Sequence, residues 1–408
     1  MSQAKELWLF TIRFPYGGGE AFLESELTVL ARTFEKIRIF PLMSDGIARS
    51  IPKNVEVINL FGADMSKPIG LLRLLKDPRR FQHVMRVCKA SAPSAAVFGK
   101  HRRELMSKLR QAMYREEVLK ARMAATYDPA RVVLFSYWTS DWATVLGLWK
   151  LADKRVHFVT RMMGFDMYDH RAPDNWQMFQ AFHVEQVDRV FTIAKAGLDH
   201  MVARFPTAKE KFRISHLATA DHGVGPWEPS ATLRIASCAH LIPLKRVHLL
   251  AEALRHIQFP VRWTHFGGGT EIKRIESIVA GLPSHVVVDL AGQRPNTDII
   301  SWYKRHPVDL FVHTSETEGG PPVAVQEAAS FGIPLLGADA GGVGEIVNST
   351  TGELLPHALT ADQLRGRIEA FAARTDRVEM RTRVRTYWNQ HFNAEHVHGE
   401  FARQLLTR

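Results

Sequence analysis

The feature that most constrains this chain is a regular alternation of short apolar runs with longer segments of helical periodicity. The runs are rich in β-branched and aromatic residues and lie at 7–12, 36–40, 132–137, 157–160, 189–193, 234–239, 261–266, 286–290, 310–314 and 333–337. Continuous apolar strands separated by helices are typical of parallel sheets that are covered on both faces. The sequence therefore predicts an α/β protein.

The chain has 408 residues, too many for one ordinary core, so we expect two domains. The strands fall into two groups separated by residues 218–230, a stretch with proline and glycine that suits an exposed linker. We predict two doubly wound, Rossmann-like domains at 1–217 and 218–385, followed by a helical segment at 386–408. Ligands of such sheets bind beyond the carboxyl ends of the strands, so we expect function in the loops that face a central cleft.

Composition excludes several classes of protein. Hydrophobic residues make up 46% of the chain and charged residues 23%, which suits a folded globular protein rather than a disordered chain or a coiled coil. Cys88 and Cys238 lie too far apart in sequence for a disulfide framework, which favours a reducing compartment. The sequence shows neither a signal peptide nor a transmembrane helix, so we expect a cytoplasmic protein.

The net charge of +11 indicates an anionic partner. The stretch that begins at Lys67 and ends at Arg122 holds fifteen lysines and arginines against four acidic residues, an excess equal to that of the whole chain. Leucines and other apolar residues accompany these bases, a mixture that suits an amphipathic helix on anionic lipid. A solvated helical face fits the pattern equally well. We expect no nucleic-acid partner, because the bases lack interleaved aromatic residues.

Two loops offer sites for an anion. Gly17, Gly18 and Gly19 follow the first strand and let the backbone approach a ligand closely, although a flexible turn explains them as well. Lys245 and Arg246 stand where a helix is predicted to begin, and cations there oppose the local dipole. A bound phosphate would resolve that conflict, whereas a solvated surface lysine is the alternative.

A third loop carries two carboxylates. Glu318 precedes a tight turn, and Glu327 lies in a short helix that is predicted to continue over 328–334. Two carboxylates suit a sugar or a ribose, because a carboxylate accepts strong hydrogen bonds from vicinal hydroxyls. An exposed helix position is the alternative for Glu327.

Glycine turns accompany this acidic segment. Gly319 and Gly320 directly follow Glu318, and Gly341 and Gly342 lie in a second turn after the 333–337 strand. We expect the second turn to place backbone amides at the same face as the carboxylates.

Together these segments resemble the retaining glycosyltransferases of family 4, which have the two-domain GT-B fold. The segment SETEGGPPVAVQEAASFGIPLLGADAGGVGEIV, which begins at Ser315, is similar to that family's paired glutamates, short helix, strand and Gly-Gly turn. The opening FPYGGGEAFLESEL, the R-x-x-G-x-D stretch at 161–166 and the loop LIPLKRV are similar too. The resemblance therefore runs over most of the chain.

The resemblance implies an N-terminal acceptor-binding domain, a C-terminal domain that binds a nucleotide-sugar donor, and a final helix that crosses back onto the N-terminal domain. Glu327 would bind the ribose, Glu318 would lie against the transferred sugar, and Lys245 would hold the donor diphosphate. Further residues that the resemblance places at the donor are Arg246, His240, Gly17, Gly18, Gly19, Gly319, Gly320, Gly341 and Gly342, and those at the acceptor or sugar pocket are Arg161, Gly164 and Asp166.

The chain departs from the family pattern in three places. Eight residues rather than seven separate Glu318 from Glu327. His240 stands where the family has an arginine beside the diphosphate, so donor affinity is expected to depend on pH. Met163 stands where the family has a histidine near the donor sugar, and a thioether cannot donate a hydrogen bond.

The resemblance predicts a retaining transferase that moves a hexose from a nucleotide-sugar to a glycan or lipid-linked acceptor, in cell-surface polysaccharide biosynthesis at the inner membrane face. We expect no metal or other cofactor, because the chain has no D-x-D-like motif and no His/Cys cluster with metal spacing. The alternative is a GT-B protein with weakened turnover that binds a nucleotide-sugar or glycan, which Met163 and His240 favour. An epimerase would need a general acid and base that the sequence does not identify.

Overall fold

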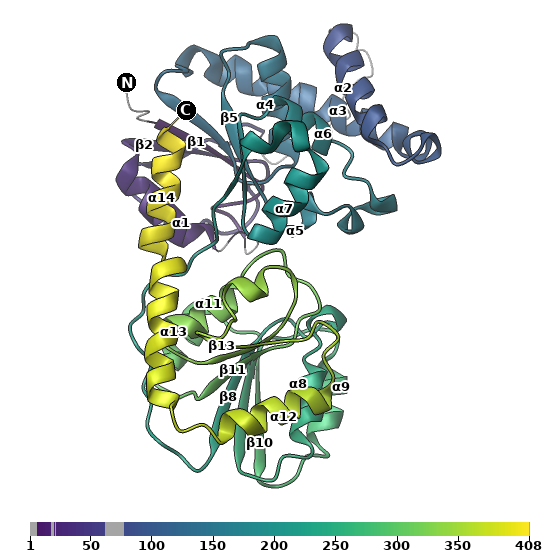
Figure 1. Cartoon of the computed structure of the whole chain (residues 1–408). Helices are drawn as coiled ribbons and strands as arrows, with labels where there is room; N and C mark the ends of the chain where they lie inside the picture. Colours follow the sequence, from purple (N-terminus) through teal and green to yellow (C-terminus); the bar gives the residue numbers. More distant parts are fainter. Residues whose placement is uncertain (1–5, 18–19, 21, 62–76, 408) are drawn as a thin grey trace. The chain divides into compact units, whose positions relative to one another are not determined.

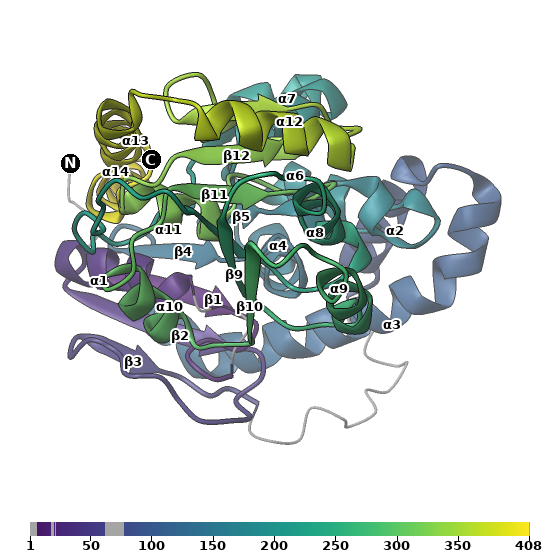
Figure 2. The same ribbon diagram turned by 90° about the horizontal axis from the view of Figure 1, so that it is seen from below.

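The computed structural model describes residues 6–17, 20, 22–61 and 77–407 (Figure 1, Figure 2). The chain divides into two compact units: unit 1 comprises residues 1–215 and 398–408, and unit 2 comprises residues 216–397. Each unit has a parallel sheet with helices on both faces. The predicted α/β class with two doubly wound, Rossmann-like domains is therefore confirmed.

Unit 1 is built on a seven-stranded parallel sheet with the order β3-β2-β1-β4-β5-β6-β7. The direction of strand addition reverses between β1 and β4, so the loops after these two strands flank the topological switch point. The strands are β1 (Glu6–Thr11), β2 (Lys36–Pro41), β3 (Val55–Val57), β4 (Val132–Ser136), β5 (Phe158–Met162), β6 (Arg189–Thr192) and β7 (Phe212–Ile214).

Helices cover both faces of this sheet because the strands are apolar on both sides. Helices α2, α3, α4 and α6 pack together on one face. Helix α1 and the end of α14 lie on the other, where Arg161 of β5 contacts side chains of both. The helices are α1 (Leu23–Thr33), α2 (Pro78–Ser91), α3 (Ala95–Met123), α4 (Asp141–Ala152), α5 (Gly164–Met167), α6 (Gln180–Gln186), α7 (Lys195–Arg204) and α14 (Ala394–Leu406).

Unit 2 is built on a six-stranded parallel sheet with the order β10-β9-β8-β11-β12-β13, which reverses between β8 and β11. Helices α8, α9 and α12 pack on one face, and α11 packs with α13 on the other. The elements are β8 (Leu233–Cys238), α8 (His248–Leu254), β9 (Val261–Phe266), α9 (Ile272–Val279), β10 (Val286–Gly292), α10 (Asn296–Tyr303), β11 (Leu310–His313), α11 (Val323–Ser330), β12 (Leu335–Ala338), β13 (Gly352–Leu355), α12 (Ala361–Ala372) and α13 (Arg377–His391).

The C-terminal segment joins unit 1 later than the predicted residue 386. Residues 386–397 still belong to unit 2, where the Trp388 indole donates a hydrogen bond to the Thr219 hydroxyl (2.9 Å). The return to unit 1 begins at His398, inside α14. Phe401 anchors it there, with its ring 5.2 Å from that of Phe135. One helix, α14, is thus shared by the two units.

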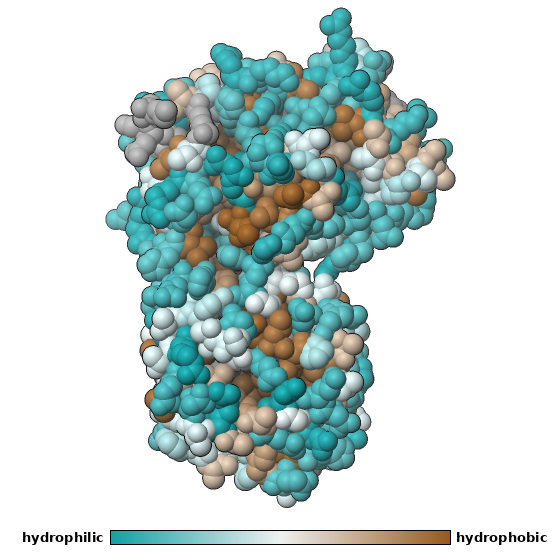
Figure 3. All heavy atoms as spheres, viewed as in Figure 1, coloured by the Kyte–Doolittle hydropathy of each residue, from teal (hydrophilic) through white to brown (hydrophobic). Residues whose placement is uncertain are grey.

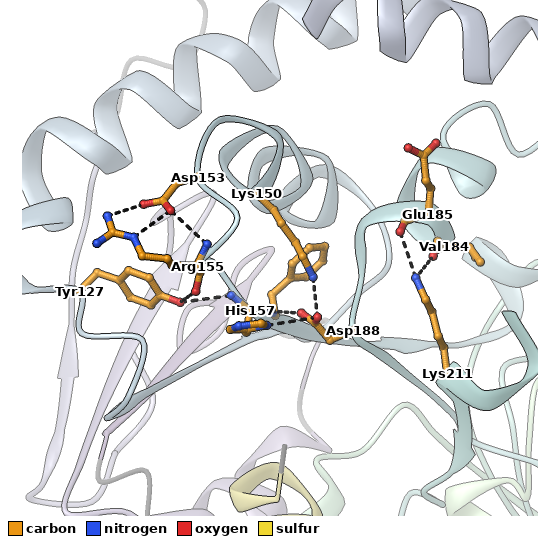
Figure 4. Close-up of polar contacts among 10 residues, drawn as sticks. Tyr127, Lys150, Asp153, Arg155, His157, Val184, Glu185, Asp188 and Lys211 are labelled. Atoms are coloured by element: carbon orange, nitrogen blue, oxygen red, sulfur yellow. Dashed lines mark hydrogen bonds and ion pairs between the residues drawn. The ribbon is translucent and has the colours of Figure 1, made fainter. Parts of the chain in front are cut away.

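Charged side chains form hydrogen bonds and ion pairs at the amino-terminal ends of strands in the unit 1 sheet (Figure 4). Lys150 donates to the Asp188 carboxylate (2.5 Å), which also accepts from the backbone N–H of Phe158 (2.8 Å). Lys211 donates to two carbonyl oxygens in the last turn of α6. These bases serve the fold, whereas most of the predicted site residues follow the carboxyl ends of the strands.

The basic stretch from Lys67 to Arg122 forms α2 and α3 over its described part, 77–122, and residues 67–76 lie outside the described residues. Val84 and Cys88 are buried, so the apolar side of α2 packs within unit 1. Packing therefore explains the apolar half of the pattern in α2, and exposed bases cover its outer side.

No helix in the described part of the chain is long and apolar enough to cross a membrane. The face seen in Figure 3 is mainly hydrophilic, and its apolar residues form separate patches. The large apolar side chains are instead concentrated in one core for each unit.

Candidate functional site

Two loops at the carboxyl edge of the unit 2 sheet bring Lys245 and Glu318 into direct contact. Lys245 follows β8 and Glu318 follows β11, so the two loops lie on either side of the switch point. The ammonium group forms an ion pair with Oε1 of Glu318. Nε2 of His313, the last residue of β11, lies 3.1 Å from the same oxygen. The structure thus joins two residues that the sequence placed in separate motifs.

Glu318 is held in its ionised form. Burial alone would raise the pKa of this carboxyl, but the hydrogen bond from His313 and the charge of Lys245 outweigh burial and lower the pKa to about 2. The side chain is 14% exposed. An ionised carboxylate offers only acceptors, so Glu318 presents fixed acceptors to any ligand with hydroxyl groups.

Glu327 has the opposite electrostatic setting. It lies in α11, which begins at Val323 and ends at Ser330, earlier than the predicted 328–334. The side chain is buried, which contradicts the alternative of an exposed helix position. Its Oε1 accepts a hydrogen bond from Nδ2 of Asn296 (2.7 Å). Burial raises the pKa of Glu327 to about 7, and the bond from Asn296 offsets only part of that rise.

Cys238 lies near Lys245 and His313 and is also influenced by the charge of Glu327. It is the last residue of β8, and it lines a small pocket together with Lys245 and His313. Burial raises the pKa of Cys238 to about 12, and the nearby charge of Glu327 adds to the rise. The charge of Glu327 therefore acts on the same strand end from which the loop with Lys245 departs.

Two glycine turns pack so closely that side chains are excluded. A Cβ on Gly341 would lie 2.0 Å from the backbone oxygen of Glu318, and φ at Gly341 is +58°. A Cβ on Gly342 would lie 2.5 Å from the backbone of Gly320. Only glycine fits such a contact. The turn after β12 therefore packs directly against the loop of Glu318 and Gly320, and the predicted contact of its backbone amides with a ligand stays a prediction.

The structure gives Arg246 a role in holding loops together. Its guanidinium donates to the backbone oxygens of Thr314 (2.9 Å), Ser315 (3.2 Å) and His357 (3.0 Å). Lys245 ends a short 3-10 turn, and α8 begins at His248, within two residues of Arg246, where the sequence predicted a helix start. Three of the five N–H donors of Arg246 are thus engaged by the protein, and its predicted contact with the nucleotide-sugar stays a prediction. His240 lies exposed in the same loop.

The loop after β1 in unit 1 already binds a carboxylate of its own. Glu20 is buried and accepts hydrogen bonds from the backbone N–H groups of Ile12 (3.2 Å), Arg13 (2.8 Å) and Phe14 (2.6 Å). The indole N–H of Trp138 donates to it as well (2.6 Å). The amide groups nearest to the strand end are therefore occupied by Glu20, which leaves fewer of them for an external anion.

The glycines of this loop are only partly described. Gly17 has φ of +64°, a left-handed value that favours glycine, and its backbone oxygen accepts from Nε of Arg49 (3.1 Å). Gly18 and Gly19 lie outside the described residues, so their predicted contact with a donor stays a prediction.

Arg161 is a core residue and does not line a sugar pocket. It is fully buried, and its Nη1 donates to Oε2 of Glu26 on α1 (2.6 Å). Its guanidinium carbon lies 4.5 Å from the ring centre of Phe401 and 5.1 Å from that of Tyr137. The expectation that Arg161 contacts a ligand is therefore wrong, because its side chain points to the face covered by α1 and α14.

We expect the substitution Arg161→Lys to lower the free energy of unfolding by about 2 kcal/mol, because lysine keeps the charge but loses the planar contact with Phe401 and the fixed bond to Glu26. Chemical denaturation monitored by circular dichroism checks this. The exposed Arg155 is the matched control, and Arg155→Lys should leave stability unchanged. A fully stable Arg161→Lys variant would contradict the structural role.

Asp166 and Gly164 belong to the short helix α5, which follows β5. The Asp166 carboxylate accepts from the backbone N–H groups of Met163 (2.6 Å) and Thr139 (2.9 Å), so it ties together the turns after β5 and β4. Burial raises the pKa of Asp166 to about 7. Asp166 lines a pocket of about 340 Å³ in unit 1. Met163 is buried beside it.

Asn296 and His313 are site residues that the sequence interpretation missed. Asn296 is the first residue of the helix after β10, and His313 is the last residue of β11. Both stand at carboxyl ends of strands, a position that marked them as candidates in principle. Within the described residues, no cluster of three or more His, Cys, Asp or Glu could hold a metal ion.

Comparisons with known proteins show similarity to glycosyltransferases. Residues 228–390 match the family model "Glycosyl transferases group 1". The putative colanic acid biosynthesis glycosyltransferase WcaL of Salmonella typhimurium is 27% identical over 189 residues, or 44% of this chain and 46% of that protein. WcaL of Escherichia coli is 23% identical over 334 residues, or 77% of this chain and 79% of that protein. The first of these matches thus spans about half of the relative's length.

Solved structures agree on the fold. HepE of Anabaena, determined with UDP and glucose, is 18% identical with a TM-score of 0.65, and the match covers 98% of this chain and 99% of that one. The lipopolysaccharide outer core galactosyltransferase WaaB is 13% identical with a TM-score of 0.68 and the same coverage. The fold is therefore α/β of the GT-B type, and the family match and the relatives support a glycosyltransferase.

Proposed function

We propose that this protein is a retaining glycosyltransferase that moves a hexose from a nucleotide-sugar donor to a glycan or lipid-linked acceptor, in the biosynthesis of a cell-surface polysaccharide. The observation that carries the proposal is the contact of Lys245 with Glu318 at the carboxyl edge of unit 2, together with the buried Glu327 on the helix that follows the same loop. This edge lies inside the part of the chain that matches the family model. The UDP and glucose in the HepE structure and the names of the WcaL relatives support the same class of reaction.

Each group of this site has a chemical task in the proposed reaction. Glu327 accepts hydrogen bonds from the ribose hydroxyls, and Glu318, ionised at neutral pH, accepts them from the hydroxyls of the transferred sugar. Lys245 stands beside Glu318 and neutralises the diphosphate as the bond from the sugar to the leaving oxygen breaks. Further hydrogen bonds to the phosphates of the nucleotide-sugar come from the backbone N–H groups of Gly319, Gly320, Gly341 and Gly342. The scheme needs no metal or other cofactor.

We further propose that the acceptor is reached at an anionic membrane face. The exposed bases on the outer side of α2 and α3, among them Arg79, Arg86 and Arg103, supply the attraction to anionic lipid. The apolar side of α2 is occupied by packing within unit 1, so the attraction is electrostatic and weakens as salt is added.

The experiment that tests the function combines thermal stabilisation with donor hydrolysis, using UDP-, GDP- and ADP-sugars. A ligand that binds only the folded state raises its stability, so one nucleotide class should stabilise the wild type and be turned over. Stabilisation without hydrolysis or transfer would instead favour the binding protein that Met163 and His240 suggest. If no donor stabilised the wild type, the assignment of the unit 2 site would fail.

Donor affinity is expected to rise with pH up to about 7 and to level off above it. Only the ionised form of Glu327 accepts two hydroxyl donors, and below its pKa of about 7 the carboxyl carries a proton. The dissociation constant should therefore fall by about tenfold for each pH unit on the acid side. Titration calorimetry with UDP-glucose checks this, because its diphosphate diester does not titrate in this range.

Cys238 and Tyr303, whose charges would act on Glu327, do not contribute to that pH profile. Burial raises the pKa of Cys238 to about 12 and places that of Tyr303 well above 10, so both groups stay neutral. The matched control is Glu327→Gln, which should bind the donor weakly and without this slope. A flat profile in the wild type would contradict the assignment of Glu327 to the ribose.

A further inference from the structure

Both protein groups that hold the Glu318 carboxylate contact the same oxygen atom. The ammonium group of Lys245 forms an ion pair with Oε1, and Nε2 of His313 lies 3.1 Å from that oxygen. An ionised carboxylate only accepts hydrogen bonds, so the proton of the second contact lies on Nε2 of His313. Within the described residues these contacts all fall on Oε1, which leaves Oε2 of Glu318 available to a ligand.

The two partners of Glu318 differ in mobility. His313 is the last residue of β11, and its side chain is 5% exposed, so the strand and the surrounding core fix the ring. Lys245 ends a short turn in the loop after β8, and its ammonium group stands on a flexible four-carbon stem. His313 is therefore the fixed partner of the carboxylate, and Lys245 is the movable one.

The proposed reaction brings a second anion to Lys245. The donor diphosphate competes with Glu318 for the ammonium group, because a lysine carries a single positive charge. The diphosphate also brings negative charge toward Glu318, and a nearby like charge favours the protonated form of a carboxyl. If Lys245 were its only partner, Glu318 would therefore take up a proton more readily when the donor binds.

Glu327 shows the behaviour of a buried carboxyl whose partner is uncharged. Its hydrogen-bond donor is the side-chain amide of Asn296 (2.7 Å). Burial raises the pKa of Glu327 to about 7, and the bond from the amide offsets only part of that rise. Burial alone would raise the pKa of Glu318 as well, but the hydrogen bond and charge of His313, together with Lys245, lower it to about 2. The two buried carboxyls thus differ in the chemistry of their partners.

An imidazole ring can take up a proton that an amide cannot. Imidazole ordinarily binds its proton about two pH units above a glutamate carboxyl. When a histidine and a glutamate are paired, the proton that arrives as pH falls therefore goes first to the ring. The ring of His313 would then carry a positive charge directly beside Oε1 of Glu318, whereas Glu327 has to take up the proton itself.

Other charged side chains on the elements around Glu318 are turned to different partners or to solvent. Arg246, in the loop after β8, donates to backbone oxygens. Glu316, in the same loop as Glu318, and Asp339, after β12, are exposed. The two groups at Oε1 therefore carry the charges that act most strongly on this carboxylate.

We propose that His313 is a positioning residue that replaces Lys245 as the counter-charge of Glu318 when a donor binds. In the ligand-free protein both groups hold Oε1. With a donor bound, the flexible lysine turns to the diphosphate, and the fixed ring of His313, which has taken up a proton from solvent, holds the carboxylate while Oε2 accepts from the transferred sugar. The inference rests on the proposed function, because it assigns a further residue to the same site.

The direct test follows the protonation of Glu318 by carbon NMR of protein with isotope-labelled glutamate, without any donor, and Glu318→Gln assigns the signal. Lys245→Ala mimics the departure of the lysine, so Glu318 should stay ionised between about pH 8 and about pH 5 in this variant. Lys245→Ala combined with His313→Gln gives Glu318 an amide partner, as Glu327 has, and Glu318 should then titrate at about pH 7. A Glu318 that titrates in Lys245→Ala, or that stays ionised in the double variant, overturns the inference.

A second measurement uses His313→Gln alone, which keeps Lys245 and a donor toward Oε1, and thermal unfolding confirms that it folds. Its maximal rate of donor hydrolysis, at saturating nucleotide-sugar, should be about tenfold lower at about pH 6 than at about pH 8, because Glu318 takes up a proton once Lys245 has turned to the diphosphate. The wild type should show no such fall. His256→Gln, the same substitution at an exposed histidine of unit 2, is the matched control and should keep the wild-type profile.

The two measurements separate failure of this inference from failure of the proposed function. If the wild type neither binds nor hydrolyses a nucleotide-sugar, the proposed function fails, and the donor-free NMR comparison still decides whether His313 can replace Lys245. If donors are turned over but Glu318 titrates in Lys245→Ala, or if His313→Gln keeps the wild-type pH profile, this inference alone is withdrawn.

Discussion

Replacing Lys245 with alanine is expected to lower the rate of sugar transfer by about a hundredfold to a thousandfold, the usual loss when one group that stabilises developing charge is removed. Lys245 contacts Glu318 at the switch point of the unit 2 sheet. The positive charge of Lys245 there stabilises the negative charge that develops on the diphosphate as its bond to the sugar breaks. Initial rates of nucleotide diphosphate release, measured at saturating donor, check this prediction.

Two controls separate the effect on catalysis from an effect on folding. Lys273→Ala removes an exposed lysine from α9 of the same unit and should leave the rate unchanged. In Lys245→Ala, the Glu318 carboxylate loses its ion-pair partner. The double variant with Glu318→Gln removes that unpaired carboxylate as well. If an unpaired Glu318 destabilised the fold of Lys245→Ala, the double variant would recover the unfolding temperature, so thermal unfolding of both variants shows whether lost stability explains the lower rate. A rate for Lys245→Ala close to that of the wild type would refute the assignment.

The sequence predicts most of this fold because its strands are buried on both faces. Each of the ten apolar runs corresponds to a strand in one of the two parallel sheets, with ends shifted by one or two residues. The three missed strands are β3, β7 and β13. Each has only three or four residues, lies at a sheet edge and contains a single buried residue. A half-exposed edge strand has no continuous apolar run, so hydrophobic patterning does not detect it.

The candidate site was predictable where its residues are close in sequence. Glu318, Glu327 and the two glycine turns all lie within one short stretch that the sheet topology brings to a single edge. Asn296 and His313 come from other strand ends, and nothing in the residues around them indicates a carboxylate partner. Their roles depend on tertiary contacts, which a local pattern does not contain.

Arg161 shows why a motif can place a residue correctly along the chain and wrongly in space. The R-x-x-G-x-D stretch spans the end of β5 and the start of α5. Successive residues of a strand point to opposite faces, and Arg161 points to the face covered by α1 and α14, where it meets Glu26. Asp166, beyond the strand end, is the member of this stretch that lines the unit 1 pocket.

Glu327→Gln is expected to stabilise the protein and impair its function at the same time. Burial holds the pKa of Glu327 at about 7, above its ordinary value of 4.5. Between these two values the folded state keeps a proton that the unfolded state releases, so the contribution of Glu327 to stability falls as pH rises through this window. Above the window the ionised side chain costs about 3 kcal/mol. Glutamine removes that cost and keeps an oxygen to accept the bond from Asn296.

The measurement is thermal unfolding of the wild type and Glu327→Gln at acid and alkaline pH. The two proteins should unfold at similar temperatures near about pH 4, and the variant should unfold about 8 °C higher near about pH 8. Its affinity for the donor should fall by about tenfold to a hundredfold, because charge-assisted bonds to the ribose are lost.

Glu318→Gln is the matched control, because the same substitution nine residues away should have the opposite sign. The pKa of Glu318 is lowered to about 2, so its ionised form stabilises the fold above its ordinary pKa and this contribution is lost as pH falls. Glu318→Gln should therefore destabilise the protein at alkaline pH, where Glu327→Gln stabilises it. If removal of the Glu327 carboxylate increases stability, the fold does not require that carboxylate. A buried ionised group that lowers stability and is nevertheless present at this site is one that function requires. If Glu327→Gln were less stable than the wild type at alkaline pH, Glu327 would be a structural residue, and its assignment to the donor would be withdrawn.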